Sequence, residues 1–217
     1  MRLNPPLKTN RKVIALASNN QKKIKELKEI LLAFSISVKT PGELDIDFEV
    51  EETGSTFEEN AALKSEELCR LTSLPSVADD SGLCVEALNG EPGLFSARYG
   101  KQGMNDRERT QFLLDNMRGK VNRNAYYYCA IAFSLPGKQT LFFKGRCDGI
   151  ITEDYDEIGQ YGFGYDPIFY FPPLQERFSR VLPEVKHQYS HRGLALSEFK
   201  SYLEGNNTSL ATDIDFS

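Results

Sequence analysis

Short apolar segments alternate with amphipathic segments along most of this chain. Residues 22–34 show the helical pattern, with Leu27 and Leu31 among the apolar side chains on one stripe. This alternation predicts an α/β domain, and the aromatic hairpin expected around residues 125–143 makes its sheet mixed and partly antiparallel. The expected strands are residues 13–18, 46–50, 76–78, 83–88, 125–133 and 139–143, and the expected helices are residues 22–34, 56–71, 106–117 and 193–203.

The length and charge of the chain limit its organisation and its partners. A chain of 217 residues suits one domain with a core of its own. We expect an N-terminal arm over residues 1–12, a single domain over residues 13–204 and a C-terminal tail over residues 205–217. The formal charge of −5 argues against a general nucleic-acid binder, which needs a basic surface, but it allows a local basic pocket for phosphates.

Cysteine usage and the first residues indicate the compartment. Cys69, Cys84, Cys129 and Cys147 are widely spaced and form no Cys-x-x-Cys pair, so we expect reduced thiols. The first residues carry no apolar leader, and no stretch is long enough to span a bilayer. The cytoplasm is therefore the expected location.

Two adjacent carboxylates, Asp79 and Asp80, follow the apolar segment 76–78, and Ser81 and Gly82 come directly after them. The pattern predicts that a strand ends here in a Ser-Gly turn that carries both acids. Because Mg²⁺ takes oxygen ligands, typically one or two carboxylates together with substrate phosphates, the pair is a candidate metal site. The alternative is a polar turn closed by an Asx hydrogen bond.

Two other segments could face such a site. Residues 18–23, Ser-Asn-Asn-Gln-Lys-Lys, lead from a strand into a helix, where backbone N–H groups and lysines can bind an anion. The alternative is a capped helix with exposed lysines. In the helix 56–71, which Ser55 or Thr56 could cap, Lys64 falls inside the apolar stripe. It needs an anionic partner in a wet cleft, or else it extends past the core to water.

Glu52 is a candidate metal ligand ahead of that helix. If residues 46–50 form a strand, its alternation places Glu52 with the apolar face and Glu51 toward solvent. The alternative is a carboxylate that only interacts with the helix dipole.

Two segments near the C-terminal end could hold a base. Residues 162–167, Gly-Phe-Gly-Tyr-Asp-Pro, offer a ring for stacking between glycines that allow close approach, or else form a tight aromatic turn or hinge. Lys186, His191 and Arg192 are hydrogen-bond donors ahead of the last helix, suited to phosphate oxygens or a base carbonyl. The alternative for these three is a solvated loop.

Taken in order, these segments resemble the inosine triphosphate pyrophosphatase family, the non-standard purine nucleoside triphosphate (dITP/XTP) pyrophosphatases. Each motif alone is weak, but the ordered set is specific and spans residues 13–203. The matching stretches are residues 18–23, 51–61 with Lys64, 78–83, 92–93, 96–99, 162–167 and 190–192.

The resemblance implies an elongated mixed β-sheet flanked by helices, in two lobes with a central substrate cleft. It implies a cytoplasmic homodimer, with no nucleic-acid or membrane partner, that hydrolyses ITP, dITP and XTP to the monophosphate and pyrophosphate. Glu52 and Asp80 would bind Mg²⁺, and Asp80 would also accept the proton of the attacking water. The implied substrate-binding residues are Ser18, Asn19, Asn20, Gln21, Lys22, Lys23, Lys64, Ser81, Phe163, Gly164, Tyr165, Asp166, Lys186, His191 and Arg192.

The chain departs from the family pattern at two places. Lys22 stands where the family often has glycine, and residues 156–159, Asp-Glu-Ile-Gly, stand where it usually has Pro-Arg-Gly. Three other functions compete with the resemblance. They are a nucleotide sensor without turnover, a general nucleoside triphosphate pyrophosphatase acting on modified pyrimidines, and, least favoured by the charge, a nucleic-acid binder.

Overall fold

The computed structural model describes residues 12–32 and 36–205. Nearly all of the expected N-terminal arm, the last residues of the helix expected over 22–34, and the tail after Gly205 lie outside the described residues. The strands are β1 (Lys12–Leu16), β2 (Ile36–Lys39), β3 (Ser76–Val85), β4 (Asn124–Ser134), β5 (Leu141–Ile151), β6 (Phe169–Phe171) and β7 (Glu176–Arg177). The α-helices are α1 (Gln21–Leu32), α2 (Phe57–Thr72), α3 (Asp106–Asn116), α4 (Pro183–Tyr189) and α5 (His191–Gly205).

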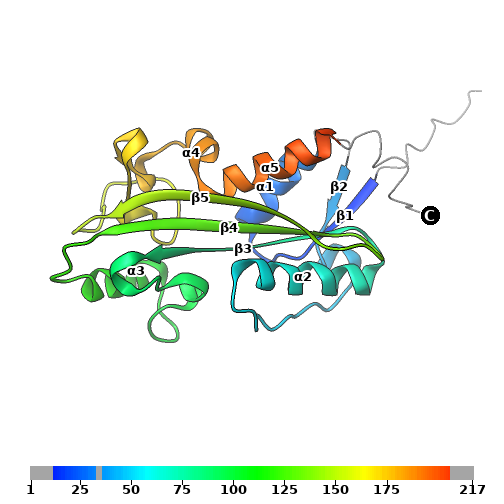
Figure 1. Cartoon of the computed structure of the whole chain (residues 1–217), viewed down its shortest axis with the longest axis horizontal. Helices are drawn as coiled ribbons and strands as arrows, with labels where there is room; N and C mark the ends of the chain where they lie inside the picture. Colours follow the sequence, from blue (N-terminus) through cyan, green and yellow to red (C-terminus); the bar gives the residue numbers. More distant parts are fainter. Residues whose placement is uncertain (1–11, 33–35, 206–217) are drawn as a thin grey trace, which may run out of the picture.

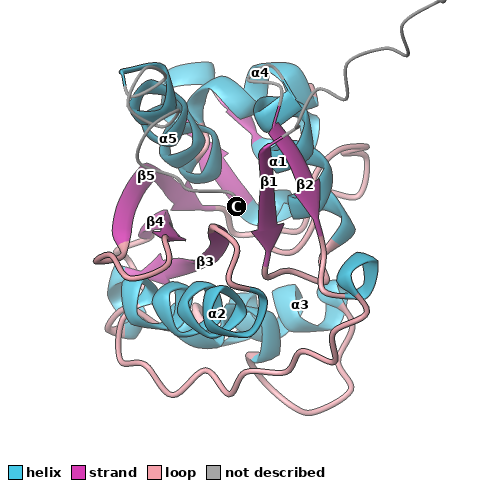
Figure 2. Cartoon of the chain, turned by 90° about the vertical axis from the view of Figure 1, so that its right-hand side faces the viewer, coloured by secondary structure: helices cyan, strands magenta, loops and turns pink. Residues whose placement is uncertain are grey.

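One mixed sheet organises the molecule. Within the described residues it has seven strands in the order β2-β1-β3-β4-β5-β6-β7. Strand β1 runs parallel to β2 and β3, whereas β3, β4 and β5 are antiparallel neighbours. The long strands β3, β4 and β5 follow the long axis of an elongated molecule, with α2 and α3 on one side and α1, α4 and α5 on the other (Figures 1 and 2). The predicted α/β class and mixed sheet are confirmed.

The apolar core is divided between the two ends of the sheet. One cluster packs α1 and α5 on β1 and β4, with Phe133 and Phe199 fully buried. A second cluster gathers α3, β6 and the turn Phe178–Arg180 that follows β7, around Leu113 and Phe178. Small residues such as Ala15 join α2 to the parallel strands. The division into two lobes stays a prediction.

The predicted turn at the paired aspartates is wrong, because β3 continues straight through it. Asp79, Asp80 and Gly82 lie opposite Ile131, Ala130 and Tyr128 of β4 in an unbroken antiparallel register. A glycine is needed in this strand for close packing rather than for a turn. A Cβ atom on it would lie 2.3 Å from the Gly93 carbonyl oxygen and 2.6 Å from Ser96 Oγ.

Other predictions differ from the structure near the ends of elements. Residues 46–50 form no strand, because no neighbouring strand pairs with them among the described residues. The last helix begins at His191 rather than at residue 193, and α4 precedes it. By contrast, α2 begins as predicted, since Thr56 and Glu59 form a complete capping box.

The described residues include no helix that is both long and apolar enough to cross a membrane. Cys69, Cys84, Cys129 and Cys147 are buried as free cysteines.

Candidate functional site

A single large cavity collects most of the predicted site residues. Its volume is about 1220 Å³, and its walls come from the start of α1, the middle of β3, α2, the loop before β6 and the α4–α5 junction. Gln21 is exposed and does not line it, and the side chain of Lys22 lies outside the described residues. The predicted residues that line the cavity are Ser18, Asn19, Asn20, Lys23, Glu52, Lys64, Asp80, Ser81, Phe163, Gly164, Tyr165, Asp166, Lys186, His191 and Arg192.

The alternation of β3 gives its two aspartates different partners. Asp80 points toward α2, where Asn60 Nδ2 donates a hydrogen bond to its Oδ2 at 3.2 Å. Asp79 points to the other side of the sheet, where its Oδ2 lies 2.8 Å from Lys23 Nζ and 3.2 Å from Arg192 Nη2. Adjacent strand residues face opposite sides of a sheet, so the two carboxylates lie in different surroundings.

Lys64 links the two carboxylates that were predicted to bind metal. Its Nζ lies 2.7 Å from Glu52 Oε1 and 3.8 Å from Asp80 Oδ1. Arg98 Nη1 lies 3.3 Å from the other oxygen of Glu52. Lys64 is therefore paired with anions inside the cavity, and the alternative in which it extends past the core to water is wrong.

The same contacts separate the proton affinities of these two carboxylates. Burial raises the pKa of Asp80 above its ordinary value; the Lys64 ammonium opposes this rise, and the Glu52 carboxylate adds to it. Burial is the largest single influence on Glu52 and opposes its charge, but the hydrogen bonds and positive charges of Lys64 and Arg98 together outweigh it and hold the pKa of Glu52 below its ordinary value. Such a difference between neighbouring carboxylates is typical of acid–base sites.

The donor set fits a divalent cation that is completed by substrate. The described part of the chain holds no cluster of three or more His, Cys, Asp or Glu side chains able to bind a metal alone. Glu52 and Asp80, however, already converge on one positive charge, that of Lys64. Two carboxylates with phosphate oxygens are the arrangement that Mg²⁺ prefers.

The segment before α1 presents donors to the same cavity. Ser18 Oγ accepts a hydrogen bond from the backbone N–H of Asn20 at 3.2 Å, and Asn20 Oδ1 accepts one from the N–H of Lys23 at 3.5 Å. The ion pair of Lys23 with Asp79 places the start of α1 beside the middle of β3. The positive end of a helix and the Lys23 ammonium together suit an anion.

Asp166 shapes the loop that carries Phe163. Its buried carboxylate accepts a hydrogen bond from the backbone N–H of Phe163 at 2.8 Å and pairs with Lys186. Gly162 has φ +78°, and a Cβ atom there would lie 2.1 Å from Asp166 Oδ2. The Lys186 ammonium lies 5.6 Å from the centre of the Phe163 ring. Asp166 and Lys186 therefore hold this loop in place as part of the cavity wall.

His191 and Arg192 lie in the first turn of α5 and are both only 8% exposed, so the solvated-loop alternative is wrong. The His191 ring stacks on Tyr127 at 4.7 Å, and its Nδ1 has no hydrogen-bond partner among the described residues. Burial lowers the pKa of His191 well below its ordinary value, and the cations of Arg192 and Lys186 add to this, so the ring is neutral. The close approach of α5 to β5 requires Gly145, where a Cβ atom would lie 2.0 Å from the His191 carbonyl oxygen.

Three contributors were not among the predicted site residues. Asn60 falls in the matching stretch 51–61 without an assigned role, yet it donates a hydrogen bond to Asp80. Arg98 belongs to a matching motif, residues 96–99, without an assigned role, and it pairs with Glu52. Tyr127 stacks on His191 from the middle of β4, and no local pattern distinguishes it from an ordinary core aromatic residue.

Comparison with known proteins gives a consistent result. The model of the Ham1 family matches residues 14–202. A dITP/XTP pyrophosphatase of Leptospira interrogans is 51% identical over 191 residues, covering 88% of this chain and 96% of the relative. The corresponding protein of Staphylococcus epidermidis is 46% identical over 192 residues, again covering 88% and 96%.

Solved structures agree on the fold. The Staphylococcus aureus Ham1 protein superposes with a TM-score of 0.84 at 45% identity, covering 90% of this chain and 100% of that one. A HAM1 protein from Coxiella burnetii superposes with a TM-score of 0.84 at 38% identity, covering 89% and 99%.

Proposed function

Because this chain belongs to the Ham1 family, we propose that it hydrolyses dITP, XTP and ITP to the nucleoside monophosphate and pyrophosphate, using Mg²⁺. It is a nucleoside triphosphate pyrophosphatase, as are its relatives at 44–51% identity. One observation carries the substrate assignment. A single cavity has the Glu52–Lys64–Asp80 cluster in one part of its wall and the donors Lys186, His191 and Arg192 in another.

The triphosphate would lie along the start of α1 and the middle of β3. Lys23 and Lys64 carry the positive charge there, and both are mostly buried. Their attraction to phosphate is therefore screened less than at an exposed site. Glu52 and Asp80 would hold the Mg²⁺, which when bound neutralises phosphate charge and acidifies water.

Asp80 would accept the proton of the attacking water. Its raised pKa makes it a better proton acceptor than an ordinary exposed aspartate. Asn60 holds one of its oxygens at 3.2 Å, so the carboxylate is oriented before substrate arrives. The cleavage itself needs in-line water and offset charge, which are effects of positioning and electrostatics.

The base would lie beside Phe163, within reach of the donors Lys186, His191 and Arg192. Hypoxanthine and xanthine have an acceptor oxygen at C6, whereas adenine has an amino donor there. Donors in the pocket would pair with the oxygen and leave the amino group of adenine facing other donors. Guanine shares the C6 oxygen, so its exclusion must depend on its 2-amino group.

Substrate choice tests this proposal directly. With Mg²⁺, we expect kcat/KM for ITP, dITP and XTP to exceed that for ATP by up to about 10⁴-fold, because a polar site strongly rejects a group that it cannot pair. The measurement is a panel of ITP, XTP, dITP, GTP, ATP and modified pyrimidine triphosphates, scoring pyrophosphate against phosphate release. Equal kcat/KM for ATP and ITP would contradict the base assignment, and preference for the pyrimidines would favour the rival enzyme.

Removal of divalent cations should abolish turnover. We expect EDTA to stop pyrophosphate release from ITP and added Mg²⁺ to restore it. The cation held by Glu52, Asp80 and the phosphates would neutralise phosphate charge and acidify water, and EDTA removes it. Calorimetric titration with ITP in EDTA serves as the control for binding. Full activity in EDTA would rule out the metal role of Glu52 and Asp80. Binding without pyrophosphate release in Mg²⁺ would favour the sensor.

A homodimeric state and a cytoplasmic location belong to the same proposal. Both rest on the family resemblance, and sedimentation of the purified chain tests the first.

A further inference from the structure

Asp156 is a buried carboxylate that the proposed reaction does not use. It is 4% exposed, and it is not among the residues that line the cavity. Ser179 Oγ donates to its Oδ2 at 2.6 Å, and Arg180 makes a two-pronged contact, with Nε 2.9 Å from Oδ2 and Nη2 2.9 Å from Oδ1. The hydrogen bonds from Arg180 hold the pKa of Asp156 well below its ordinary value, so the carboxylate is charged at neutral pH.

These contacts fasten the loop before Gly162 to the short turn Phe178–Arg180. The backbone N–H of Tyr161 donates to the Ser179 carbonyl oxygen at 2.9 Å. A Cβ atom at Gly159 would lie 2.5 Å from both Asp156 Oδ2 and Ser179 Cβ. The loop is thus held closely enough to the turn that position 159 has no room for a side chain.

The fastened loop leads directly into Phe163, whose side chain lines the cavity. The turn Phe178–Arg180, to which the loop is fastened, also contacts residues of the cavity wall through Phe178. The Lys186 ammonium lies 5.0 Å from the centre of the Phe178 ring. The Phe178 ring also stacks on Tyr127, with 6.3 Å between the ring centres, and Tyr127 stacks on His191. The Asp156 contacts therefore join Phe163 to the donors that would recognise the base.

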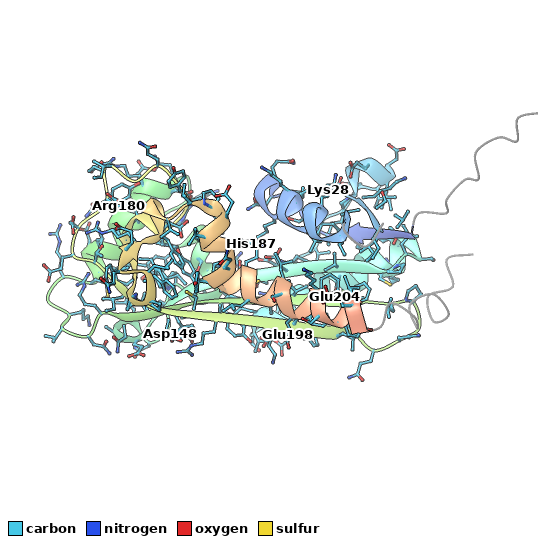
Figure 3. All side chains as sticks on the ribbon, turned by 90° about the horizontal axis from the view of Figure 1, so that it is seen from above. Lys28, Asp148, Arg180, His187, Glu198 and Glu204 are labelled. Carbon is cyan, nitrogen blue, oxygen red and sulfur yellow. The ribbon has the colours of Figure 1, made fainter. Side chains whose placement is uncertain are left out.

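Figure 3 shows Arg180 toward one end of the molecule and His187, on α4, nearer its middle. Asp156, which makes the contacts with Ser179 and Arg180, lies within residues 156–159, where the chain departs from the Pro-Arg-Gly pattern. It is separate from the Glu52–Lys64–Asp80 cluster, so its effect should fall on the base and spare the phosphates.

We propose that Asp156, through Ser179 and Arg180, is a positioning residue that fixes the Phe163 loop for binding of the purine base. This inference rests on the proposed function, and it adds a residue that sets affinity for the nucleoside part of the substrate. A charge-assisted, two-pronged contact is strong and geometrically specific, so its loss should loosen the loop.

The test compares Asp156→Asn and Arg180→Gln with the wild-type chain. Each variant should raise KM for ITP by about tenfold, the change that loss of one such contact produces. The value of kcat should stay within about twofold, and the inhibition constant of inorganic tripolyphosphate, which has no base, should not change. The double variant should be no worse than either single one, because both remove the same contact.

The matched control is Arg118→Gln, which breaks an exposed ion pair with Asp115 on α3 and should leave all three constants unchanged. An unchanged KM in a folded Asp156→Asn variant would overturn the proposal. So would a parallel rise in the tripolyphosphate constant, or a fall in kcat alone. If the Asp156→Asn variant does not fold, the Arg180→Gln variant, which changes a half-exposed side chain, provides the test. The same three constants are measured: KM and kcat for ITP and the inhibition constant of tripolyphosphate.

Failure of the proposed function is recognised separately. Wild-type turnover of ITP is measured first; without it, dissociation constants of ITP and tripolyphosphate from calorimetry replace the kinetic constants. A weakening confined to ITP still supports the positioning role. A wild-type chain that binds tripolyphosphate but not ITP overturns both proposals.

Discussion

Replacement of Asp80 by asparagine is expected to lower kcat for ITP by about three to four orders of magnitude, the contribution of a general base and its orientation. An amide cannot accept the proton of the attacking water, and it brings no negative charge to the cation. Binding should persist, because Lys23, Lys64 and the pocket for the base are left in place. KM should therefore change by only a few fold, as when a transition-state interaction alone is lost.

Steady-state pyrophosphate release and calorimetric binding of ITP together check this expectation. The matched control is Asp148→Asn, at an exposed aspartate of β5 that does not line the cavity and is labelled in Figure 3. It should leave kcat and KM unchanged. Near-normal turnover in the Asp80→Asn variant would remove Asp80 from the role of proton acceptor.

Replacement of Asp79 by asparagine should instead lower the stability of the free protein. The variant removes the negative charge that Lys23 and Arg192 both contact in a mostly buried place, where breaking an ion pair costs about 3–5 kcal/mol. For a chain of this size that corresponds to a fall in Tm of about 6–20 °C. Inorganic tripolyphosphate should raise Tm more in the variant than in the wild type, because the anion replaces the lost negative charge.

Thermal unfolding with and without tripolyphosphate measures both effects. The exposed Asp148→Asn variant again serves as the control, with no expected change in Tm or in its response to the anion. An unchanged Tm in the Asp79→Asn variant would mean that Lys23 and Arg192 find other partners. Asp79 would then not be the residue that joins the start of α1 to α5.

Features that depend on neighbouring residues could be predicted from the sequence. The cap at the start of α2 needs only Thr56 and Glu59, three positions apart, and Thr56 is one of the two residues predicted to cap this helix. The stripe that contains Lys64 follows from helical spacing, and it does place the lysine in the cavity. Both are local effects, so a single segment carries the information.

The position of Glu52 was predicted correctly from a wrong intermediate step. The predicted alternation requires a strand over residues 46–50, and that segment forms none. Glu52 nevertheless lines the cavity, and Glu51 is exposed. The contact of Glu52 with Lys64 at 2.7 Å accounts for the orientation of the Glu52 side chain. An ion pair between residues twelve positions apart, and not strand alternation, therefore turns Glu52 into the cavity.

The Asp-Asp-Ser-Gly segment shows where local patterns fail. Serine and glycine after two acids favour a turn in isolation. Ten consecutive residues of β3 pair with β4, and that pairing keeps the segment extended. Because the partner strand is about fifty residues away in the sequence, no local pattern could indicate this outcome.

The sequence by itself determined the α/β class, the family and most of the predicted side chains that line the cavity, because periodicity and ordered motifs are properties of the chain alone. Only the tertiary structure decided what each charge faces. Asp80 contacts Asn60 and Lys64 of α2. Asp79 contacts Lys23 and Arg192 on the opposite side of the sheet. Partners of a buried charge come from whichever elements pack against it, and packing brings together residues as distant as Asp79 and Arg192.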